Sequence, residues 1–182
     1  ATVGEPWGDA VEGVLTFRGS PTRSWHGEGP VPDAPVVAWR FPDDRMCSMT
    51  SISGEQQEWC GMGWTGQPAV FERGGRTWVV FGAYDSAVHF VDGETGERLL
   101  PDFPTGDIIK GSLTVDPDGY PLVYVGSRDD ELRVVAIDRD EPVELWSLHA
   151  YDVEPTRWNN DWDSSPLVLD GHLFAGGENS RF

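Results

Sequence analysis

The sequence has few basic residues and no long apolar run. Its 182 residues include 13 Lys and Arg against 31 Asp and Glu, which gives a formal net charge of −18. Phosphate binding needs a basic patch, so nucleic acid is not an expected partner, and an anionic membrane surface is disfavoured for the same reason. A transmembrane helix needs roughly 18 apolar residues in a row, and no stretch approaches that length. We therefore expect no direct insertion into a membrane.

Cysteine is also scarce, with only Cys47 and Cys60, which bound the stretch CSMTSISGEQQEWC. A zinc site needs three or four ligands at short spacing, and no histidine lies nearby, so zinc is not expected. We predict a disulfide that closes a polar loop and removes roughly 3 kcal/mol of unfolded-chain freedom. Two unpaired thiols are the alternative. A disulfide indicates an oxidising compartment, so we expect an extracellular or cell-surface location.

Helical periodicity is missing from the whole chain, whereas turn formers are abundant, with 22 Gly and 14 Pro. These features predict an all-β fold. A unit also recurs: Pro68, Ser112 and Pro166 begin three copies, and the starts lie 44 and 54 residues apart. The matched glycines of these copies are Gly82, Gly126 and Gly176. Such spacings are typical of propeller blades.

Each unit is predicted to contain four short strands. The expected strands are 67–71, 77–82, 87–92 and 96–100 in the first unit, 111–115, 121–126, 132–138 and 143–148 in the second, and 165–169 and 172–177 in the third. Asp170-Gly171 is a two-residue hairpin signal between the last two. Residues 36–41 are predicted to add an outer strand, which places Trp39 where Trp146 lies in a later unit. Phe182 would lie inside a third strand of the last unit.

A set of spaced residues carries a family resemblance. Ala136, Asp138 and Trp146 in one copy, with Asp92, Thr95 and Gly96 in the other, resemble the tryptophan-docking repeat of quinoprotein-type β-propellers. Residues 15–42 look like the opening segment of many bacterial pyrroloquinoline-quinone-like repeat proteins. An indole on an outer strand can pack flat on the neighbouring blade and donate its N–H to a carbonyl there. The Asp is expected to cap the Thr-Gly turn with its side chain.

The resulting organisation is an incomplete propeller of about two and a half blades, whereas closure needs at least about four. We expect a tail (1–13), an opening segment with the outer strand and the Cys47–Cys60 loop (14–63), two blades (64–107 and 108–160) and a partial blade (161–182). The remaining blades, or a second chain, are expected to complete the ring.

The candidate binding residues lie in the loops predicted to crowd one face around the central channel. Asn160, Asp161, Asp163 and Glu178 could supply oxygen ligands to calcium there. Asp85, Asp129 and Asn179 each follow a matched glycine by three residues. Asp and Asn are also the residues that tight turns prefer, so turn formation remains the alternative for both sets.

The leading functional hypothesis is a non-catalytic, extracellular scaffold for binding or assembly, with calcium as its candidate metal. No nucleophile elbow, phosphate loop or serine–histidine–acid pattern is visible in the sequence. The alternative is a quinoprotein-like dehydrogenase that uses pyrroloquinoline quinone and calcium, with its cofactor residues in blades not present here. The resemblance implies adjacent cysteines for such enzymes, and Cys47 and Cys60 are 13 residues apart. We therefore do not expect the quinone to bind this segment.

Overall fold

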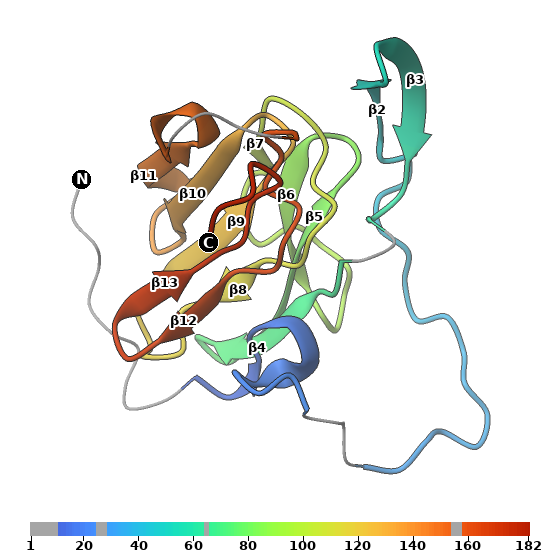
Figure 1. The fold of residues 1–182 in the computed structure, drawn as a ribbon. Coiled ribbons are helices and arrows are strands. Elements are labelled where there is room, and N and C mark those ends of the chain that lie inside the picture. Colours follow the sequence, from blue (N-terminus) through green and yellow to red (C-terminus); the bar gives the residue numbers. More distant parts are fainter. Residues whose placement is uncertain (1–10, 25–28, 64–65, 154–157) are drawn as a thin grey trace.

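The computed structural model describes residues 11–24, 29–63, 66–153 and 158–182 (Figure 1). The prediction of an all-β fold is confirmed, since the helices are limited to two short 3-10 turns in this part of the chain. The strands are β1 (Gly13–Val14), β2 (Cys47–Ile52), β3 (Glu55–Cys60), β4 (Ala69–Arg73), β5 (Arg76–Ala83), β6 (Ala87–Asp92), β7 (Phe103–Pro104), β8 (Thr114–Val115), β9 (Leu122–Gly126), β10 (Glu131–Ala136), β11 (Val143–His149), β12 (Leu167–Leu169) and β13 (His172–Phe174). The 3-10 turns are η1 (Phe17–Gly19) and η2 (Ala150–Val153).

Two sheets follow the chain in simple order. The first is β4-β5-β6-β7, with β1 added beside β4, and the second is β8-β9-β10-β11. A third unit contains the hairpin β12–β13, in which Leu169 pairs with His172 across the predicted turn. Asp170 and Gly171 adopt φ angles of 50° and 70°, which the two-residue turn requires. All pairs are antiparallel, so each unit is an antiparallel meander or the start of one.

The main hydrophobic core lies between the first and second sheets. Phe71 and Phe90 come from the first sheet, and Val115 and Val123 come from the second. All four side chains are almost completely buried. Removing one such aromatic side chain from a core typically costs about 3 to 5 kcal/mol, so the two sheets stabilise one another.

Backbone hydrogen bonds between successive units recur at matched positions. The N–H of Ile109 donates to the carbonyl of Ala83 at 3.1 Å, and the N–H of Trp162 donates to that of Ser127 at 3.1 Å. Ala83 and Ser127 each come directly after the matched glycine of their unit. The repeat in the sequence therefore corresponds to a repeat in how one unit meets the next.

The matched glycines are needed for this close approach. A Cβ atom at Gly82 would lie 2.2 Å from the side chain of Ile109, and one at Gly126 would lie 2.3 Å from the carbonyl oxygen of Trp162. Real Cβ atoms essentially never come so close to another atom. Any larger residue would push the following unit away from these sheets.

The chain segment around β1 connects all three units. Gly13 pairs with Phe71 in β4, and the carbonyl of Leu15 accepts a hydrogen bond from the N–H of Val115 in β8. The Thr16 hydroxyl lies 3.4 Å from the carbonyl of Pro166, which precedes β12. This segment therefore lies along the first strand of each unit, a role that its sequence did not reveal.

Trp39 docks on the first unit as expected, although its strand was predicted wrongly. Its Nε1–H donates to the carbonyl of Gly93 at 3.0 Å, and its indole lies over Gly96, where a Cβ would be only 2.9 Å from the ring. Residues 36–41 nevertheless form no strand. Val36 and Val37 are 86% and 70% exposed, so their β propensity is not supported by packing against a neighbouring strand.

The turn beneath Trp39 has the predicted cap. The Asp92 carboxylate accepts hydrogen bonds from the N–H groups of Glu94 at 2.9 Å and Thr95 at 3.1 Å. Gly96 adopts a φ of 76°, a conformation that glycine reaches without a steric penalty. The backbone hydrogen bonds lower the pKa of Asp92, so the carboxylate stays ionised in the turn.

Residues 47–60 form a hairpin rather than the predicted loop. β2 and β3 pair along their full length and stand apart from the main sheets in Figure 1. Ser53 and Gly54 form the turn, with φ angles of 52° and 82°. The prediction was wrong because polar residues occupy both faces of these strands, which hides the usual alternation.

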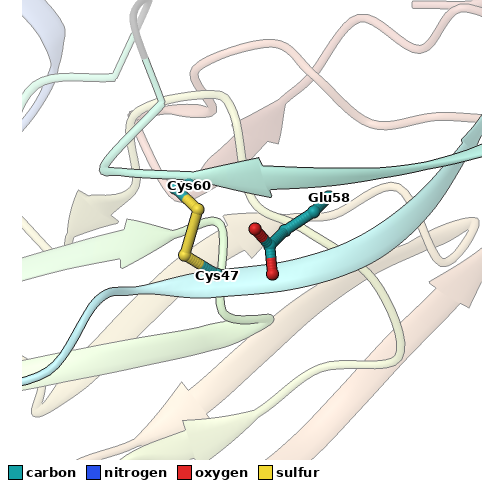
Figure 2. Close-up of side chains that lie close together, drawn as sticks. All are labelled: Cys47, Glu58 and Cys60. Carbon is teal, nitrogen blue, oxygen red and sulfur yellow. A yellow bond between two sulfur atoms is a disulfide. The ribbon is translucent and has the colours of Figure 1, made fainter.

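The predicted disulfide is confirmed. Cys47 and Cys60 are cross-strand partners joined through their sulfur atoms, and Figure 2 shows the bond between β2 and β3. The carboxylate of Glu58 lies beside it. Because both sulfurs are in the disulfide, these three side chains do not provide thiolate ligands for a metal. The disulfide is consistent with an oxidising environment.

Two further strand predictions were wrong. The fourth strand of the first unit is Phe103–Pro104 rather than 96–100. Within 96–100, Arg98 pairs with Val91 of β6 only as an isolated bridge, and Pro101 interrupts the backbone ladder. In the third unit, the second strand ends at Phe174, and no third strand forms through Phe182. Gly176 and Gly177 lie in this stretch and provide no side chain for a sheet to pack.

Candidate functional site: an acidic cavity beside the hairpin

A polar cavity of 620 Å³ lies between the β2–β3 hairpin, the loop before β8, the β9–β10 turn and residues 158–161. Acidic residues outnumber basic ones four to two on its wall. Its lining residues are Ser51, Ser53, Trp59, Asp107, Lys110, Arg128, Asp130, Trp158, Asn159, Asn160, Asp161 and Glu178.

Arg128 attaches the hairpin to the sheets. Its guanidinium donates to the carboxylate of Asp161 at 2.5 Å, to the hydroxyl of Thr50 at 2.9 Å and to the carbonyl of Ser51 at 3.1 Å. Burial alone would lower the pKa of Arg128, but Asp161 and the neighbouring acids outweigh it and raise the pKa. The residue is therefore a fixed positive charge that connects three parts of the chain.

The structure brings three of the predicted metal ligands together. Carboxylate oxygens of Asp161, Asp163 and Glu178 all lie within 4.8 Å of one another. The N–H of Glu178 donates to the carbonyl of Asp161 at 2.9 Å, which holds the two segments in register. Tyr84 and Arg128, at the matched positions of the other units, donate in the same way. The repeat architecture itself therefore places Glu178 beside Asp161.

Asn160, the fourth predicted ligand, lies beside this cluster on the cavity wall. Its side chain is 8% exposed, and its Oδ1 atom has no hydrogen-bond partner among the described residues. The Oδ1 atom of Asp163 is buried without a partner in the same way. A buried acceptor without a donor costs about 1 to 3 kcal/mol, so both atoms favour a ligand or water that completes them.

This donor set fits calcium in its chemistry, because carboxylate and amide oxygens are the ligands that a hard cation prefers. The ammonium group of Lys110 contacts Asp163 and lies 4.0 Å from Asp161. Burial raises the pKa of Asp163 although Lys110 opposes that shift. A calcium ion would therefore have to displace the Lys110 ammonium from the cluster.

The cavity does not fit pyrroloquinoline quinone, which carries three carboxylates. Lys110 and Arg128 are its two cations, and both already contact carboxylates of the chain. Cys47 and Cys60 are bonded across the hairpin and are not the adjacent pair that the resemblance implies. No step of quinone chemistry is therefore assigned to these residues.

The three matched turn residues do not line this cavity. The Asp85 carboxylate contacts the Nε2 atom of His89 at 3.1 Å, and that of Asp129 contacts both guanidinium NH groups of Arg133 at 2.7 and 2.8 Å. Asn179 donates to the carbonyl of Ala150 at 3.3 Å. Their partners lie within the fold, which favours the structural alternative for this set.

Sequence reasoning missed the contribution of the hairpin and the two cations. Trp59 comes from β3, and Lys110 and Arg128 come from loops of different sequence regions. Ser53-Gly54, flanked by equal runs of six residues, was the available hairpin signal. The positions of Lys110 and Arg128 depend on how the units pack, which no local pattern encodes.

Comparison with known proteins finds no family model that matches the chain and no curated protein with significant similarity. Within the described ranges, no helix is both long and apolar enough to span a membrane.

Proposed function

We propose that the chain is part of a non-catalytic, extracellular β-propeller that acts as a scaffold for binding or assembly. One observation carries the proposal. Each of the first two units contacts the next unit at its matched glycine, and the third unit has the same glycine without a neighbouring unit among the described residues. Gly82 and Gly126 are each in close contact with the following unit, whereas among the described residues a Cβ at Gly176 would have only the ring of Phe182 within 4 Å, at 3.7 Å. Because the first two copies each receive a following unit, the third is suited to receive another.

Trp146 supports the same proposal. It is 45% exposed and lines two open cavities of 430 and 390 Å³. Trp39, its counterpart before the first unit, is docked on the Gly93–Gly96 turn. We define the assembly edge as Trp146, Leu169, Phe174 and Gly176. Its occupants are the remaining strands of the third unit, which would cover Trp146, and a following unit of the same type, which would cover Gly176, from the rest of the ring or from a second chain.

An extension of the chain tests this assignment. Phe182 matches Val88 in the repeat, so a copy of residues 89–107 placed after Phe182 offers Trp146 the same turn that receives Trp39. We expect a higher melting temperature and protection of Trp146 from acrylamide quenching, measured as the difference from a Trp146→Phe background. The control carries Gly96→Val in the added copy, which blocks the docked indole. Equal quenching with both extensions would contradict the assembly edge.

The non-catalytic part of the proposal has its own test. The chain is incubated with pyrroloquinoline quinone and calcium, and dye-linked oxidation of an alcohol is measured. We expect no turnover above that of the free cofactor. Saturable turnover would favour the dehydrogenase instead.

Calcium binding at Asp161, Asp163 and Glu178 is a second candidate function, favoured by the unpartnered oxygens of Asn160 and Asp163. Calcium at millimolar concentration is expected to raise the melting temperature by a few degrees, because binding to the folded state stabilises it. Lys110→Met should tighten calcium binding, since it removes the competing ammonium, and Asp163→Asn should weaken it. If a chelator and added calcium both leave the melting temperature unchanged, this candidate is wrong.

A further inference from the structure

The acidic cavity retains negative charge after its internal ion pairs are counted. Lys110 and Arg128 contact Asp161 and Asp163. The Asp107 carboxylate receives hydrogen bonds from neutral donors, the hydroxyl of Thr50 at 3.1 Å and the N–H of Ile108 at 2.7 Å. The cavity therefore has carboxylate charge that its own cations do not match.

Asp130 contributes most clearly to this unmatched charge. Its carboxylate forms no hydrogen bond or ion pair with the described residues, although its carbonyl accepts the indole N–H of Trp162 at 3.2 Å. Burial raises the pKa of Asp130; His149 opposes this, and the charges of Asp161, Asp129 and Asp107 reinforce it. A cation in the cavity would relieve the same repulsion.

Asn160 adds a requirement for a hydrogen-bond donor. Asn160 lines the cavity, and its Oδ1 atom is buried and has no partner among the described residues. An amide oxygen accepts hydrogen bonds and donates none. A ligand other than a metal ion can satisfy it only through an N–H or O–H group.

Two tryptophans complete the wall. Trp59 comes from the hairpin, where its ring lies 5.4 Å from that of Tyr84, and Trp158 exposes 82% of its surface. The face of an indole attracts an organic cation through its quadrupole. The cavity therefore favours an organic group that is positively charged and donates hydrogen bonds. Such a group would match the unpaired carboxylate charge, the acceptor atom without a donor and the faces of the indoles.

We propose that this cavity binds a ligand through an ammonium group. The carboxylates of Asp107 and Asp130 supply the countercharge, Asn160 accepts a hydrogen bond from the ammonium, and Trp59 contacts its alkyl and cationic surface. Anions are disfavoured by the excess of acids, and the chain's net charge of −18 adds to that effect at long range. The ammonium can belong to a free amine or to a lysine side chain of a partner protein, since both present the same chemistry.

Calorimetric titration of the full chain with matched probes tests the proposal. n-Butylammonium is compared with 1-butanol, which has a similar size without the charge, and with acetate as an anion. We expect saturable binding of the amine, weakening with added salt, and much weaker binding of the other two probes. Acetyl-Gly-Lys-Gly-amide then distinguishes the two sources, because tighter binding of the peptide than of butylammonium indicates a lysine side chain.

Variants locate the binding in the cavity. Asp130→Asn keeps the shape, and asparagine tolerates the positive φ of 68° at this position. It should weaken amine binding by about three- to fivefold. Trp59→Leu should weaken it by about 2- to 30-fold. Asp140→Asn and Trp146→Leu are the matched controls, since they remove an exposed acid and a partly exposed indole outside the cavity, and both should bind the amine normally.

The results that would overturn this proposal differ from those that would overturn the proposal about the assembly edge. Butanol binding as tightly as butylammonium, equal weakening by Asp130→Asn and Asp140→Asn, or no saturable binding of any amine would each reject it. If calcium binds and excludes the amine while Trp59→Leu has no effect, the cavity is a metal site and the proposal fails. None of these measurements depends on whether another segment covers the assembly edge.

Discussion

The first unit and the assembly edge carry the same docking features in opposite surroundings. On the first unit, Trp39 and Phe41 pack against a cluster that includes Phe81 and Val91. At the assembly edge, Trp146 and Phe174 are 45% and 37% exposed. The type of residue at a docking position therefore does not by itself determine how far its side chain is buried. The comparison teaches that burial depends on whether a neighbouring segment is present to receive them.

The largest expected effect comes from the glycines. Gly126→Ala should lower the free energy of unfolding by about 3 kcal/mol, because its Cβ would meet the backbone oxygen of Trp162, which cannot rotate away. Gly176→Ala, at the matched position of the assembly edge, should change it by less than about 0.5 kcal/mol. Urea denaturation of both variants measures the difference. Equal losses would mean that the edge is already occupied in solution.

A smaller difference is expected between the two tryptophans. Trp39→Ala removes an indole hydrogen bond to Gly93 and the contact with Gly96, and should cost about 2 kcal/mol. Trp146→Ala should cost about 0.5 kcal/mol, because its indole is half exposed. Thermal unfolding of the two variants at one protein concentration tests this order. A larger loss for Trp146 would reverse the comparison.

These contacts also explain what could be predicted from sequence. The Asp92 cap, the Asp170-Gly171 turn and the repeat glycines have local or periodic causes, so they are visible in the residues themselves. The docking of Trp39 was predicted correctly by analogy with Trp146. The strand predicted for residues 36–41 does not form, because a strand needs the edge of a neighbouring strand to pair with. Sequence alone therefore predicted the docking residue better than the backbone that carries it.

The acidic cavity shows the opposite case. Asp161 and Glu178 were predicted together from the loop positions of the repeat, and the matched backbone hydrogen bond brings them together. Lys110 and Arg128, which neutralise Asp161, were not anticipated. Their contacts form only when the fold brings together loops that are far apart in the sequence. Arg128 and Asp161, for example, are separated by 33 residues. Charge composition could indicate an acidic site, but it could not indicate which acids were already paired.

A pH-dependent effect, the smallest of the three, probes the covered side of the first unit. His89 is 1% exposed, and its two ring nitrogens lie 3.1 Å from Asp85 and 3.0 Å from Asp102. Arg98 also contacts Asp102, and the ring of Phe41 covers the imidazole at 5.3 Å. Burial opposes protonation, but the two carboxylates outweigh it and raise the pKa of His89.

The sign of the pH effect follows from that shift. Because the pKa of His89 is higher in the folded state than the value of about 6.5 in the unfolded chain, its stabilisation is complete below that value and is lost as the pH rises through the folded pKa. Asp102, whose pKa is lowered by Arg98 and His89 against the effect of burial, loses its stabilisation only as the pH falls through the acidic range. The free energy of unfolding should therefore decrease from slightly acidic to alkaline pH.

His89→Gln is the variant that tests this assignment. Urea denaturation of the wild-type chain and of the variant is compared between pH 6 and pH 9, about the range over which a histidine with a raised pKa titrates. The variant should lose the decrease in stability across this range. The matched pair of the second unit, Asp129 and Arg133, provides the contrast, since an arginine stays charged throughout. An unchanged pH profile in the variant would show that the ion pairs of His89 do not stabilise the covered side of the first unit.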